Sequence, residues 1–364
     1  MDIKPKNGKI KIYIDTVIFD LQKAGGISVY WYELLRRFLS DGRFDTVLID
    51  SGLKKENIFY AKLDLSGVKT LKIRKRFNRY RALNYKENEA HYFVSSYYRY
   101  SKNKNAVNVT VVHDFTYEYY AKGLRKRIHT HQKYKAIGKS EKIVCISENT
   151  RRDLDKFVGL RKGQEARVIY NGVGENYRKM TDGEIAAASA LLTPEQADAA
   201  AGEFVLYVGA RAGYKNWDKA AEIFKRLPDA FRMVSVGGGP LSPSEQNLLG
   251  GALSRHVHIP FADEQVLCLL YNRARALLYL SEYEGFGIPV VEAQKCGCPV
   301  VALNRSSIPE VAGEGVLLLR DSAAKVTVDD LKRLKEKSFG YDKPFSWGAT
   351  FADFRLFLTG REGL

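Results

Sequence analysis

Short apolar runs recur along the whole chain, each bounded by polar or glycine-containing segments, and they predict buried parallel strands. Helical spacing of apolar residues over 27–39, 148–157 and 216–227 alternates with these runs. Alternation of this kind is typical of βαβ units, and it predicts an α/β fold with parallel sheets. The predicted strands are 9–15, 46–49, 91–94, 109–112, 142–146, 204–209, 231–236, 257–259, 277–280, 300–303 and 316–319.

The strand–helix pattern begins twice, which predicts two doubly wound domains facing across a cleft. We assign residues 1–178 to the first domain and 179–340 to the second. Residues 173–202 are polar and alanine-rich, without a strand pattern, and we interpret them as a linker. A last helical segment begins near Phe345 and Trp347, so 341–364 forms a separate C-terminal helix.

The composition predicts a folded, soluble protein. The 364 residues are 45% apolar, and no apolar run is long enough to span a bilayer. The first residues lack the apolar core of a secretion signal, so a cytoplasmic protein is expected. The four cysteines have no second cysteine or histidine pair beside them, which favours small buried residues over a metal site. They are Cys145, Cys268, Cys296 and Cys298.

Positive charge is concentrated in the first half. Residues 1–178 contain 37 Lys and Arg against 19 Asp and Glu, whereas residues 179–364 contain 21 against 23. Two dense stretches, 72–81 and 123–135, interleave these cations with Ile, Leu, Phe and Tyr. Such a surface indicates an anionic partner, and the interleaved apolar side chains favour anionic membrane headgroups.

The most informative motif is Glu284-Gly-Phe-Gly-Ile-Pro-Val-Val-Glu292. It follows the predicted strand 277–280, and Pro289 suits the first turn of a helix. Glu284 is therefore expected in a strand-to-helix loop and Glu292 one turn into the helix. At this edge of a parallel sheet, helix N-termini and glycine backbone bind anions, while carboxylates accept hydrogen bonds from hydroxyls.

This segment resembles the E-x7-E signature of retaining glycosyltransferases of the GT-B fold, specifically family 4. The resemblance implies that Glu284 holds the donor sugar and Glu292 the ribose of a nucleotide sugar. The loop between them would line the same site with Gly285, Phe286, Gly287 and Ile288. It also implies that Ser306 and Ser307, in Ser-Ser-Ile-Pro-Glu-Val, donate to the diphosphate.

Three further segments are similar to motifs of that family. Gly209-Ala-Arg-Ala-Gly-Tyr-Lys-Asn216 resembles its cationic loop, so Arg211 and Lys215 are the predicted diphosphate clamps. In the first domain, Gly25-Gly26-Ile27-Ser resembles a loop whose N–H groups face the donor phosphate. His113 ends a predicted strand, and in the family the matching residue contacts the donor sugar. The sequence shows no Asp-x-Asp motif of the metal-dependent kind, and we expect no metal cofactor.

The resemblance implies transfer of a sugar from a nucleotide sugar with retention of configuration, and a C-terminal helix in 341–364 that packs back on the first domain. A GDP-mannose-type donor is favoured, and a UDP-hexose is the alternative. The expected acceptor is a glycan or a polyprenyl-diphosphate-linked glycan of bacterial surface-polysaccharide assembly. The basic first half would then place the enzyme on the inner face of the cytoplasmic membrane.

Two rival interpretations remain open from the residues. A nucleotide-sugar epimerase or a glycan phosphorylase has the same architecture, although a phosphorylase needs a pyridoxal-phosphate lysine. A nucleic-acid-binding protein would explain the basic half and predicts steeply salt-dependent binding, but it leaves Glu284 and Glu292 without a role. We therefore expect a nucleotide sugar, and no nucleic acid, as a partner.

Overall fold

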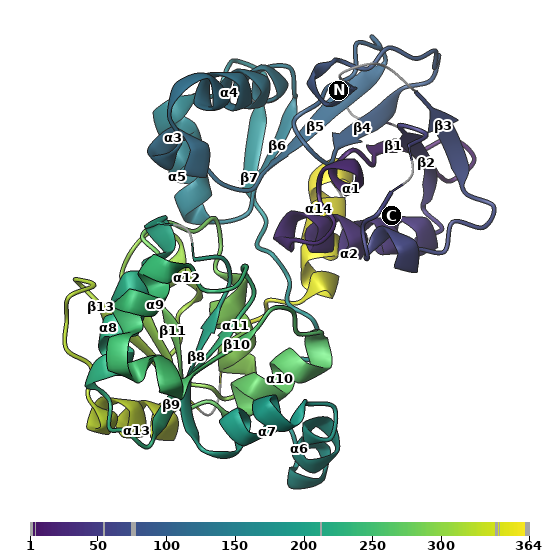
Figure 1. The fold of residues 1–364 in the computed structure, drawn as a ribbon. Coiled ribbons are helices and arrows are strands. Elements are labelled where there is room, and N and C mark those ends of the chain that lie inside the picture. Colours follow the sequence, from purple (N-terminus) through teal and green to yellow (C-terminus); the bar gives the residue numbers. More distant parts are fainter. Residues whose placement is uncertain are drawn as a thin grey trace. The chain divides into compact units, whose positions relative to one another are not determined.

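The computed structural model describes residues 3, 5–53, 55–73, 78–211, 213–338, 341 and 343–360, and the chain divides into two compact units (Figure 1). The first unit comprises Met1–Gly172 and Ser346–Leu364, and the second comprises Val173–Phe345. Each unit has its own parallel sheet with helices packed against it.

The first sheet has seven parallel strands in the order β3-β2-β1-β4-β5-β6-β7. Strand order reverses between β1 and β4, which makes this a topological switch point. The central strands are buried along nearly their whole length, which explains their apolar sequences. The strands are β1 (Ile10–Asp15), β2 (Phe44–Asp50), β3 (Lys69–Lys72), β4 (His91–Ser95), β5 (Ala106–Val112), β6 (Lys142–Cys145) and β7 (Glu165–Val168).

In the first unit two helices follow β1, two follow β5 and one follows β6, whereas no α-helix lies between β2 and β5 among the described residues. In α2 the buried side chains recur every three or four residues, so one face packs on the sheet. Ser147 caps α5 by accepting a hydrogen bond from the Thr150 N–H at 3.0 Å. The helices are α1 (Ile18–Leu21), α2 (Gly26–Ser40), α3 (Thr116–Tyr120), α4 (Gly123–Gly138), α5 (Glu148–Phe157) and α14 (Trp347–Thr359).

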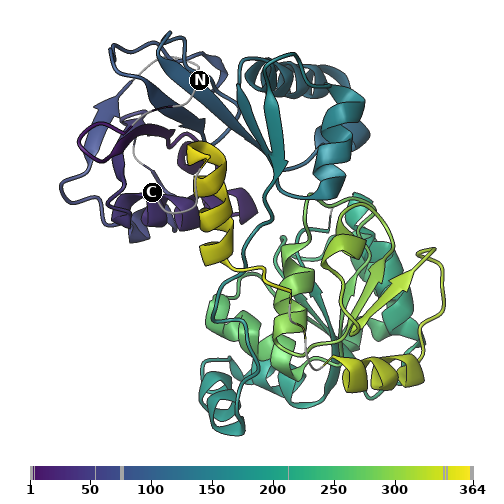
Figure 2. The same ribbon diagram turned by 180° about the vertical axis from the view of Figure 1, so that it is seen from behind.

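The C-terminal helix α14 packs beside α2 in the first unit (Figures 1 and 2). The Phe38 ring lies 4.9 Å from Phe351 and 5.8 Å from Phe354. The Tyr92 hydroxyl donates to the Leu358 carbonyl, so β4 also contacts the end of the helix. Helix α14 is therefore part of the first unit, although the second unit precedes it in the sequence.

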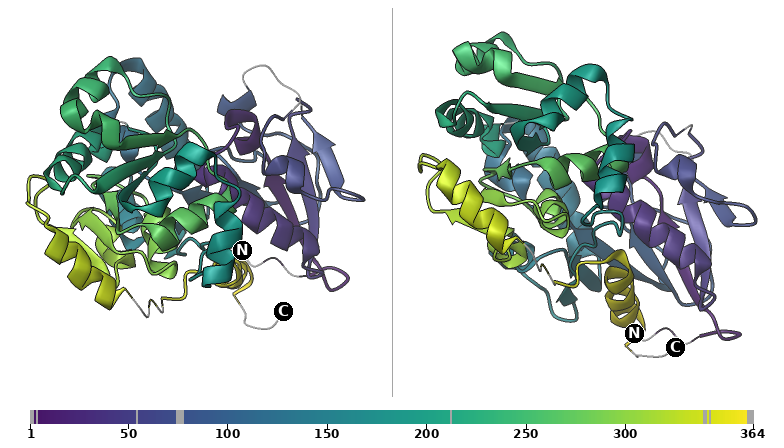
Figure 3. Two further views of the ribbon diagram at one scale, coloured as in Figure 1. Left: turned by 60° about the horizontal axis from the view of Figure 1, so that its bottom comes forward. Right: turned by 90° about the horizontal axis from the view of Figure 1, so that it is seen from below.

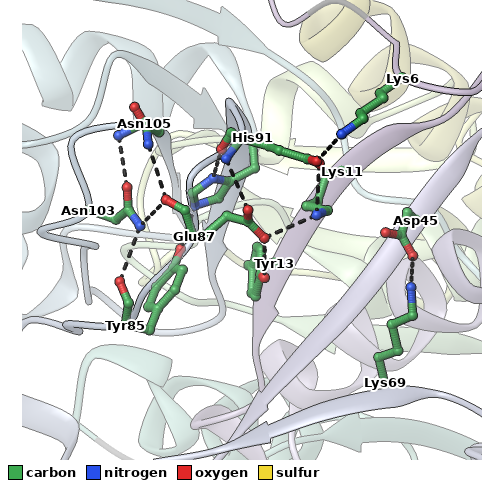
Figure 4. A network of polar contacts seen from close by, with 11 residues as sticks. Lys6, Lys11, Tyr13, Asp45, Lys69, Tyr85, Glu87, His91, Asn103 and Asn105 are labelled. Carbon is green, nitrogen blue, oxygen red and sulfur yellow. Dashed lines mark hydrogen bonds and ion pairs between the residues drawn. The ribbon is translucent and has the colours of Figure 1, made fainter.

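A polar network joins β1 to the segments that flank β4 (Figure 4). The Glu87 carboxylate accepts hydrogen bonds from Lys11 Nζ at 3.0 Å and from the Tyr13 hydroxyl at 2.8 Å. Burial opposes ionisation, but these bonds and one from the Glu89 N–H outweigh it and lower the pKa of Glu87 to about 2. The network thus ties β1 to the segment that precedes β4.

The second sheet has six parallel strands in the order β10-β9-β8-β11-β12-β13. Its switch point lies between β8 and β11. Leu319 of the edge strand β13 and Leu331 and Leu334 of helix α13 (Val328–Lys337) belong to one core cluster. Figure 3 shows the ribbon from two further directions. The strands are β8 (Glu203–Val208), β9 (Phe231–Val236), β10 (His256–Ile259), β11 (Ala276–Tyr279), β12 (Val300–Leu303) and β13 (Val316–Leu319).

The helices of the second unit are α6 (Asp182–Ser189), α7 (Pro194–Ala201), α8 (Trp217–Arg226), α9 (Pro243–Leu249), α10 (Glu264–Arg273), α11 (Ile288–Lys295), α12 (Ile308–Val311) and α13 (Val328–Lys337). In the part of the chain that the structure describes, no helix is both long and apolar enough to cross a membrane.

The prediction of a linker over 173–202 is wrong. These residues form α6 and α7, which begin with capping boxes at Thr181 and Thr193 and pack against α10. Residues 173–178 lie in the second unit, because the Val173 N–H bonds to the Phe345 carbonyl at 3.2 Å. The weakly apolar sequence of α6 and α7 hides this packing.

Candidate functional site

Two loops meet at the switch point of the second sheet. Strands β8 and β11 are neighbours, with Val205 paired to Ala276 and Leu206 to Leu277. Because both strands run the same way, loops 209–216 and 280–287 leave the sheet at one edge. The Glu282 N–H donates to the Tyr214 carbonyl at 2.9 Å and joins the two loops directly.

Lys215 and Glu284, both predicted site residues, form an ion pair between these loops. Lys215 Nζ lies 2.5 Å from Glu284 Oε1, and the side chains are 18% and 13% exposed. The ammonium also lies 5.5 Å from the Tyr279 ring centroid. Such a cation can exchange its carboxylate partner for a phosphate, and the released carboxylate can then accept hydroxyl hydrogen bonds.

Ser306 and Ser307 hold the backbone of Glu284. The Glu284 N–H donates to Ser306 Oγ at 2.9 Å, and Ser307 Oγ donates to the Glu284 carbonyl at 3.0 Å. Ser306 adopts a left-handed backbone conformation with φ of 49°, and Ser307 is fully buried. In the structure both hydroxyls therefore position Glu284, whereas the sequence prediction directs them to a diphosphate.

The turn into α11 depends on Gly287. Its φ of 99° favours glycine, and a Cβ there would lie 2.8 Å from Ile308 Cδ1. Phe286 is buried with its ring 5.2 Å from Phe345, while Gly285 is partly exposed. Ile288 is the first residue of α11, so residues 285–287 join Glu284 to the N-terminus of this helix.

Glu292 lies on α11 with two tyrosines around its carboxylate. The Tyr271 hydroxyl donates to Glu292 Oε2 at 3.0 Å, and the Tyr177 side chain also hydrogen-bonds to it. Burial raises the pKa of Glu292 to about 7, and the two tyrosine bonds only partly offset this. The carboxyl group therefore changes charge near neutral pH, which is unusual for a glutamate.

The guanidinium of Arg211 is bonded to protein groups, whereas the sequence predicts that it holds a diphosphate. Its side chain is 6% exposed, and its Nε donates to Glu245 Oε1 at 2.7 Å. The guanidinium also donates to the carbonyls of Gly237, Gly239 and Pro240. Arg211 thus fastens the glycine-rich loop after β9, while Lys215 alone of the predicted pair contacts Glu284.

In the first unit, Gly25 and Gly26 lie at the start of α2 as predicted, and Ile27 is its second residue. The Gln22 side chain fills the space beside Gly25, where a Cβ would lie 2.8 Å from Gln22 Oε1. Gln22 Oε1 also accepts the Ser28 N–H at 3.3 Å. These contacts set the path of the loop into the helix.

His113 follows β5 and is buried. Its ring meets the Tyr30 ring edge-on, with 5.0 Å between centroids, and its Nε2 has no hydrogen-bond partner among the described residues. Burial lowers the pKa of His113 to about 4, despite the opposing charge of Asp114. The imidazole is therefore neutral at physiological pH.

Sequence reasoning missed the residues that position the predicted ones. Asn216, with φ of 51°, donates from Nδ2 to the Leu280 carbonyl at 2.9 Å and to Glu282 Oε1 at 3.0 Å. An asparagine directly after Lys215 and before a helix is a signal for such a left-handed position. Tyr177 and Tyr271 have no comparable signal in the sequence.

The described residues contain no group of three or more His, Cys, Asp or Glu side chains placed to hold a metal ion. All four cysteines are buried and free, in agreement with the prediction of small buried residues.

Two family models match the chain, one in each unit. The model described as Glycosyltransferase Family 4 matches residues 24–176, and that described as Glycosyl transferases group 1 matches residues 194–346. The second match contains both loops of the Lys215–Glu284 site.

Curated relatives match parts of the chain. The O-antigen chain mannosyltransferase B of Escherichia coli is 30% identical over 40% of this chain and 42% of the relative. The D-inositol 3-phosphate glycosyltransferase of Mycolicibacterium gilvum is 29% identical over 46% of this chain and 38% of the relative. Each match thus spans less than half of the relative's length.

Solved structures extend the likeness to the whole fold. The Anabaena protein Alr3699/HepE, solved in complex with UDP-glucose, superposes with a TM-score of 0.70 at 14% identity, covering 97% of this chain and 100% of that chain. At this level of identity the likeness shows the fold, which is GT-B.

Proposed function

We propose that this chain, which matches the Glycosyltransferase Family 4 model over 24–176 and the Glycosyl transferases group 1 model over 194–346, is a retaining, metal-independent hexosyltransferase of the GT-B fold that uses a nucleotide sugar. The observation that carries this proposal is the ion pair between Lys215 and Glu284 at the switch point of the second sheet. It presents a cation and a sugar-binding carboxylate at one place, as departure of a nucleoside diphosphate requires.

In the proposed reaction, Lys215 turns from Glu284 to the diphosphate when the donor binds, and Glu284 accepts hydrogen bonds from hydroxyls of the donor sugar. The bond between the anomeric carbon and the diphosphate breaks while the acceptor oxygen attacks from the same face. The leaving phosphate takes the acceptor proton. Lys215 stabilises the charge that grows on the diphosphate, so its contribution is largest in the transition state.

We favour a GDP-mannose-type donor and take a UDP-hexose as the second candidate. The matched Escherichia coli relative is a mannosyltransferase by name, which supports mannose, whereas the Anabaena structure holds UDP-glucose. Calorimetry with GDP, UDP, ADP and TDP and with their sugars tests both. Tight binding of one nucleotide sugar is expected, and absence of binding by all of them would refute the proposed function.

Nucleotide affinity is expected to fall about tenfold from pH 8 to pH 6, because the ribose hydroxyls need the ionised carboxylate of Glu292, whose pKa is about 7. Below that pKa the carboxyl group is protonated before binding. Calorimetry across this range measures the effect. Glu292→Gln should weaken binding and flatten the profile, while Tyr271→Phe should move it to higher pH by removing a bond that lowers the pKa. A profile unchanged in Glu292→Gln would contradict this role.

Transfer is expected to continue in excess chelator, because the ammonium of Lys215 supplies the positive charge that a divalent cation supplies in metal-dependent enzymes. Initial rates after dialysis against EDTA, with and without added magnesium or manganese, measure this. Loss of activity in EDTA that either cation restores would show that the diphosphate is held by a metal.

We further propose that the acceptor is a glycan or a lipid-linked glycan at an anionic membrane surface, as in surface-polysaccharide assembly. The predicted basic stretch 123–135 forms most of α4, where Leu124 and Ile128 are 72% and 44% exposed. Tyr119 and Tyr120 of α3 are exposed nearby in the sequence. Cations beside exposed apolar side chains suit adsorption to anionic headgroups, at about 1 kcal/mol for each cation. Arg74, Lys75, Arg76 and Phe77 of the other stretch lie outside the described residues.

The protein is expected to sediment with liposomes that contain anionic lipid and to dissociate as salt rises. The double variant Leu124→Ser, Arg125→Glu should lose most of this binding, because it removes an exposed apolar side chain and reverses a charge on α4. Reversal of Lys332 and Arg333 on α13, both exposed, is the matched control and should bind as wild type. If both variants sediment to the same extent, the membrane contact does not lie on α4.

A further inference from the structure

Two of the four cysteines are in contact one helical turn from Glu292, in the second unit. Cys268 lies on α10 and Cys296 caps the C-terminus of α11, and their sulfur atoms are 3.8 Å apart. The same two helices are joined by a second pair, since the Tyr271 hydroxyl donates to Glu292 Oε2 at 3.0 Å. Tyr271 follows Cys268 by one turn and Glu292 precedes Cys296 by one turn, so both pairs lie where the helices face each other.

The segment that precedes α6 contacts the cysteine pair and Glu292 alike. Cys268 Sγ donates to the Asn176 carbonyl at 3.3 Å, and the next residue, Tyr177, hydrogen-bonds to the Glu292 side chain. Three elements therefore hold the two sulfur atoms and the carboxylate together, namely α10, α11 and this segment. A change in the distance between the sulfur atoms is expected to move groups that position the carboxylate.

The backbone beside Cys296 is fixed on its other side. Gly297 has a φ of 69°, and its carbonyl accepts a hydrogen bond from Lys335 Nζ at 2.9 Å. A disulfide holds its sulfur atoms about 2.0 Å apart, so closure from 3.8 Å requires an approach of about 1.8 Å. Because the turn after α11 is anchored, we expect Cys268 and the part of α10 around it to make this approach, and Tyr271 to move with them.

Cys268 is the more acidic member of the pair. The hydrogen bond from the Cys296 thiol outweighs burial and lowers the pKa of Cys268 to about 6, and the same contact raises the pKa of Cys296. Burial raises the pKa of Cys145 and of Cys298 to about 12. Since the thiolate is the form that attacks an oxidant, Cys268 is the expected nucleophile and Cys296 the thiol that attacks second.

We propose that Cys268 and Cys296 are oxidised by hydrogen peroxide to a reversible disulfide that lowers the affinity of the second unit for a nucleotide. The Cys268 thiolate attacks one peroxide oxygen, which breaks the O–O bond, leaves a sulfenic acid and releases hydroxide. The Cys296 sulfur then attacks the Cys268 sulfur, the S–S bond forms, and a second hydroxide leaves. The protons of the two thiols convert both hydroxides to water, so two thiols lose two electrons and one peroxide gains them. A dithiol reverses the step by exchange.

The effect on nucleotide affinity rests on the proposed function, in which Glu292 holds the ribose, whereas formation of the disulfide does not. Displacement of Tyr271 moves the Glu292 carboxylate away from the ribose hydroxyls, and loss of one hydrogen bond to a charged group weakens binding about tenfold. The pKa of Glu292 is about 7, so at pH 8 its carboxylate is largely ionised. Oxidation removes the Cys268 thiol, which raises that pKa, so the carboxylate stays ionised in the disulfide form. A difference measured at pH 8 therefore reports its position and not its charge.

Thiol titration of the peroxide-treated whole chain, after quenching and in denaturant, tests the disulfide directly. The number of free thiols should fall from four to two and return to four after treatment with dithiothreitol. Mass spectrometry should find a peptide that links Cys268 to Cys296. Because these residues are only 4% and 2% exposed, the larger glutathione disulfide should leave all four thiols free. Four free thiols after peroxide, or glutathione bound to Cys268 without the internal link, would overturn the proposal.

Calorimetry at pH 8 compares the reduced and oxidised protein, with the nucleoside diphosphate that the nucleotide panel identifies. Oxidation should weaken binding about tenfold, and dithiothreitol should restore it. Cys268→Ala and Cys296→Ala should each bind as the reduced wild type and ignore peroxide, whereas Cys298→Ala, at the neighbouring buried cysteine, should keep the response. Melting temperatures show whether each variant is folded.

Equal affinity of the reduced and oxidised wild type would overturn the proposed effect on nucleotide binding, and so would a peroxide response that persists in both Cys268→Ala and Cys296→Ala. Failure of the reduced wild type to bind any nucleotide would instead refute the proposed function. The linked peptide is detected without a nucleotide, so failure of the disulfide proposal and failure of the proposed function are distinguishable.

Discussion

Replacement of Lys215 with alanine is expected to lower turnover by about two to three orders of magnitude, as removal of other electrostatic stabilisers does. Lys215 is the predicted cation that the structure places beside Glu284, whereas Arg211 is held by Glu245 and backbone carbonyls. The charge on the diphosphate grows as its bond to the sugar breaks, so the loss should fall on turnover more than on donor affinity. Steady-state kinetics with the donor identified by the nucleotide panel measure it.

Lys219 on α8 supplies the control for this variant. Its side chain is 32% exposed and pairs only loosely, at 3.8 and 4.0 Å, with Asp218 and Glu222. Lys219→Ala removes the same charge four residues away and should retain nearly full activity. Since Lys215→Ala leaves the partly buried Glu284 without its cation, melting temperatures must accompany the kinetics. Turnover of Lys215→Ala close to that of wild type would exclude it as the diphosphate clamp.

Replacement of Glu284 with alanine is expected to reduce transfer by about two orders of magnitude while leaving the affinity for the free nucleoside diphosphate largely intact. A hydrogen bond to a charged group contributes about 1.5–3 kcal/mol, or roughly ten- to hundredfold, and a sugar offers more than one hydroxyl. Parallel measurements of transfer rate and nucleotide affinity check this. Glu314→Ala, at an exposed acid of the same unit, is the control.

Glu284→Ala also removes the ion-pair partner of Lys215, so the affinity for the nucleoside diphosphate provides a second test. The freed ammonium should bind the nucleoside diphosphate no more weakly than in wild type. Loss of nucleotide affinity equal to the loss of transfer would instead mean that Glu284 serves the nucleotide. The double variant Lys215→Ala, Glu284→Ala should be less impaired than the two single effects combined, because the residues contact one another.

Most of the central strands were predictable, because parallel strands covered by helices are apolar throughout. The predicted strands 231–236, 300–303 and 316–319 coincide with β9, β12 and β13, and the predicted helix 148–157 coincides with α5. The edge strands β3 and β7 escaped prediction, since they are largely exposed and their sequences, Lys-Thr-Leu-Lys and Glu-Ala-Arg-Val, are polar. Their pairing is set by the neighbouring strand and not by their own pattern.

At the site too, local sequence patterns predicted some features and long-range contacts set the others. Lys215 and Glu284 each lie in the loop that follows an apolar strand, so the sequence alone indicated that both lie at the carboxyl edge of a parallel sheet. Their adjacency depends on β8 pairing with β11, a contact between distant parts of the chain. The partners of Arg211, the tyrosines around Glu292 and the serines behind Glu284 are likewise long-range contacts that no local pattern encodes.

By itself, the sequence determined the fold class, the resemblance to GT-B glycosyltransferases and the two residues now paired at the switch point. These depend on local periodicity and on short motifs, which tertiary contacts leave unchanged. Only the tertiary structure decided which cation lies beside Glu284 and which carboxyl group has a pKa near neutrality. Burial and hydrogen-bond partners set these properties, and both arise from residues far apart in the chain.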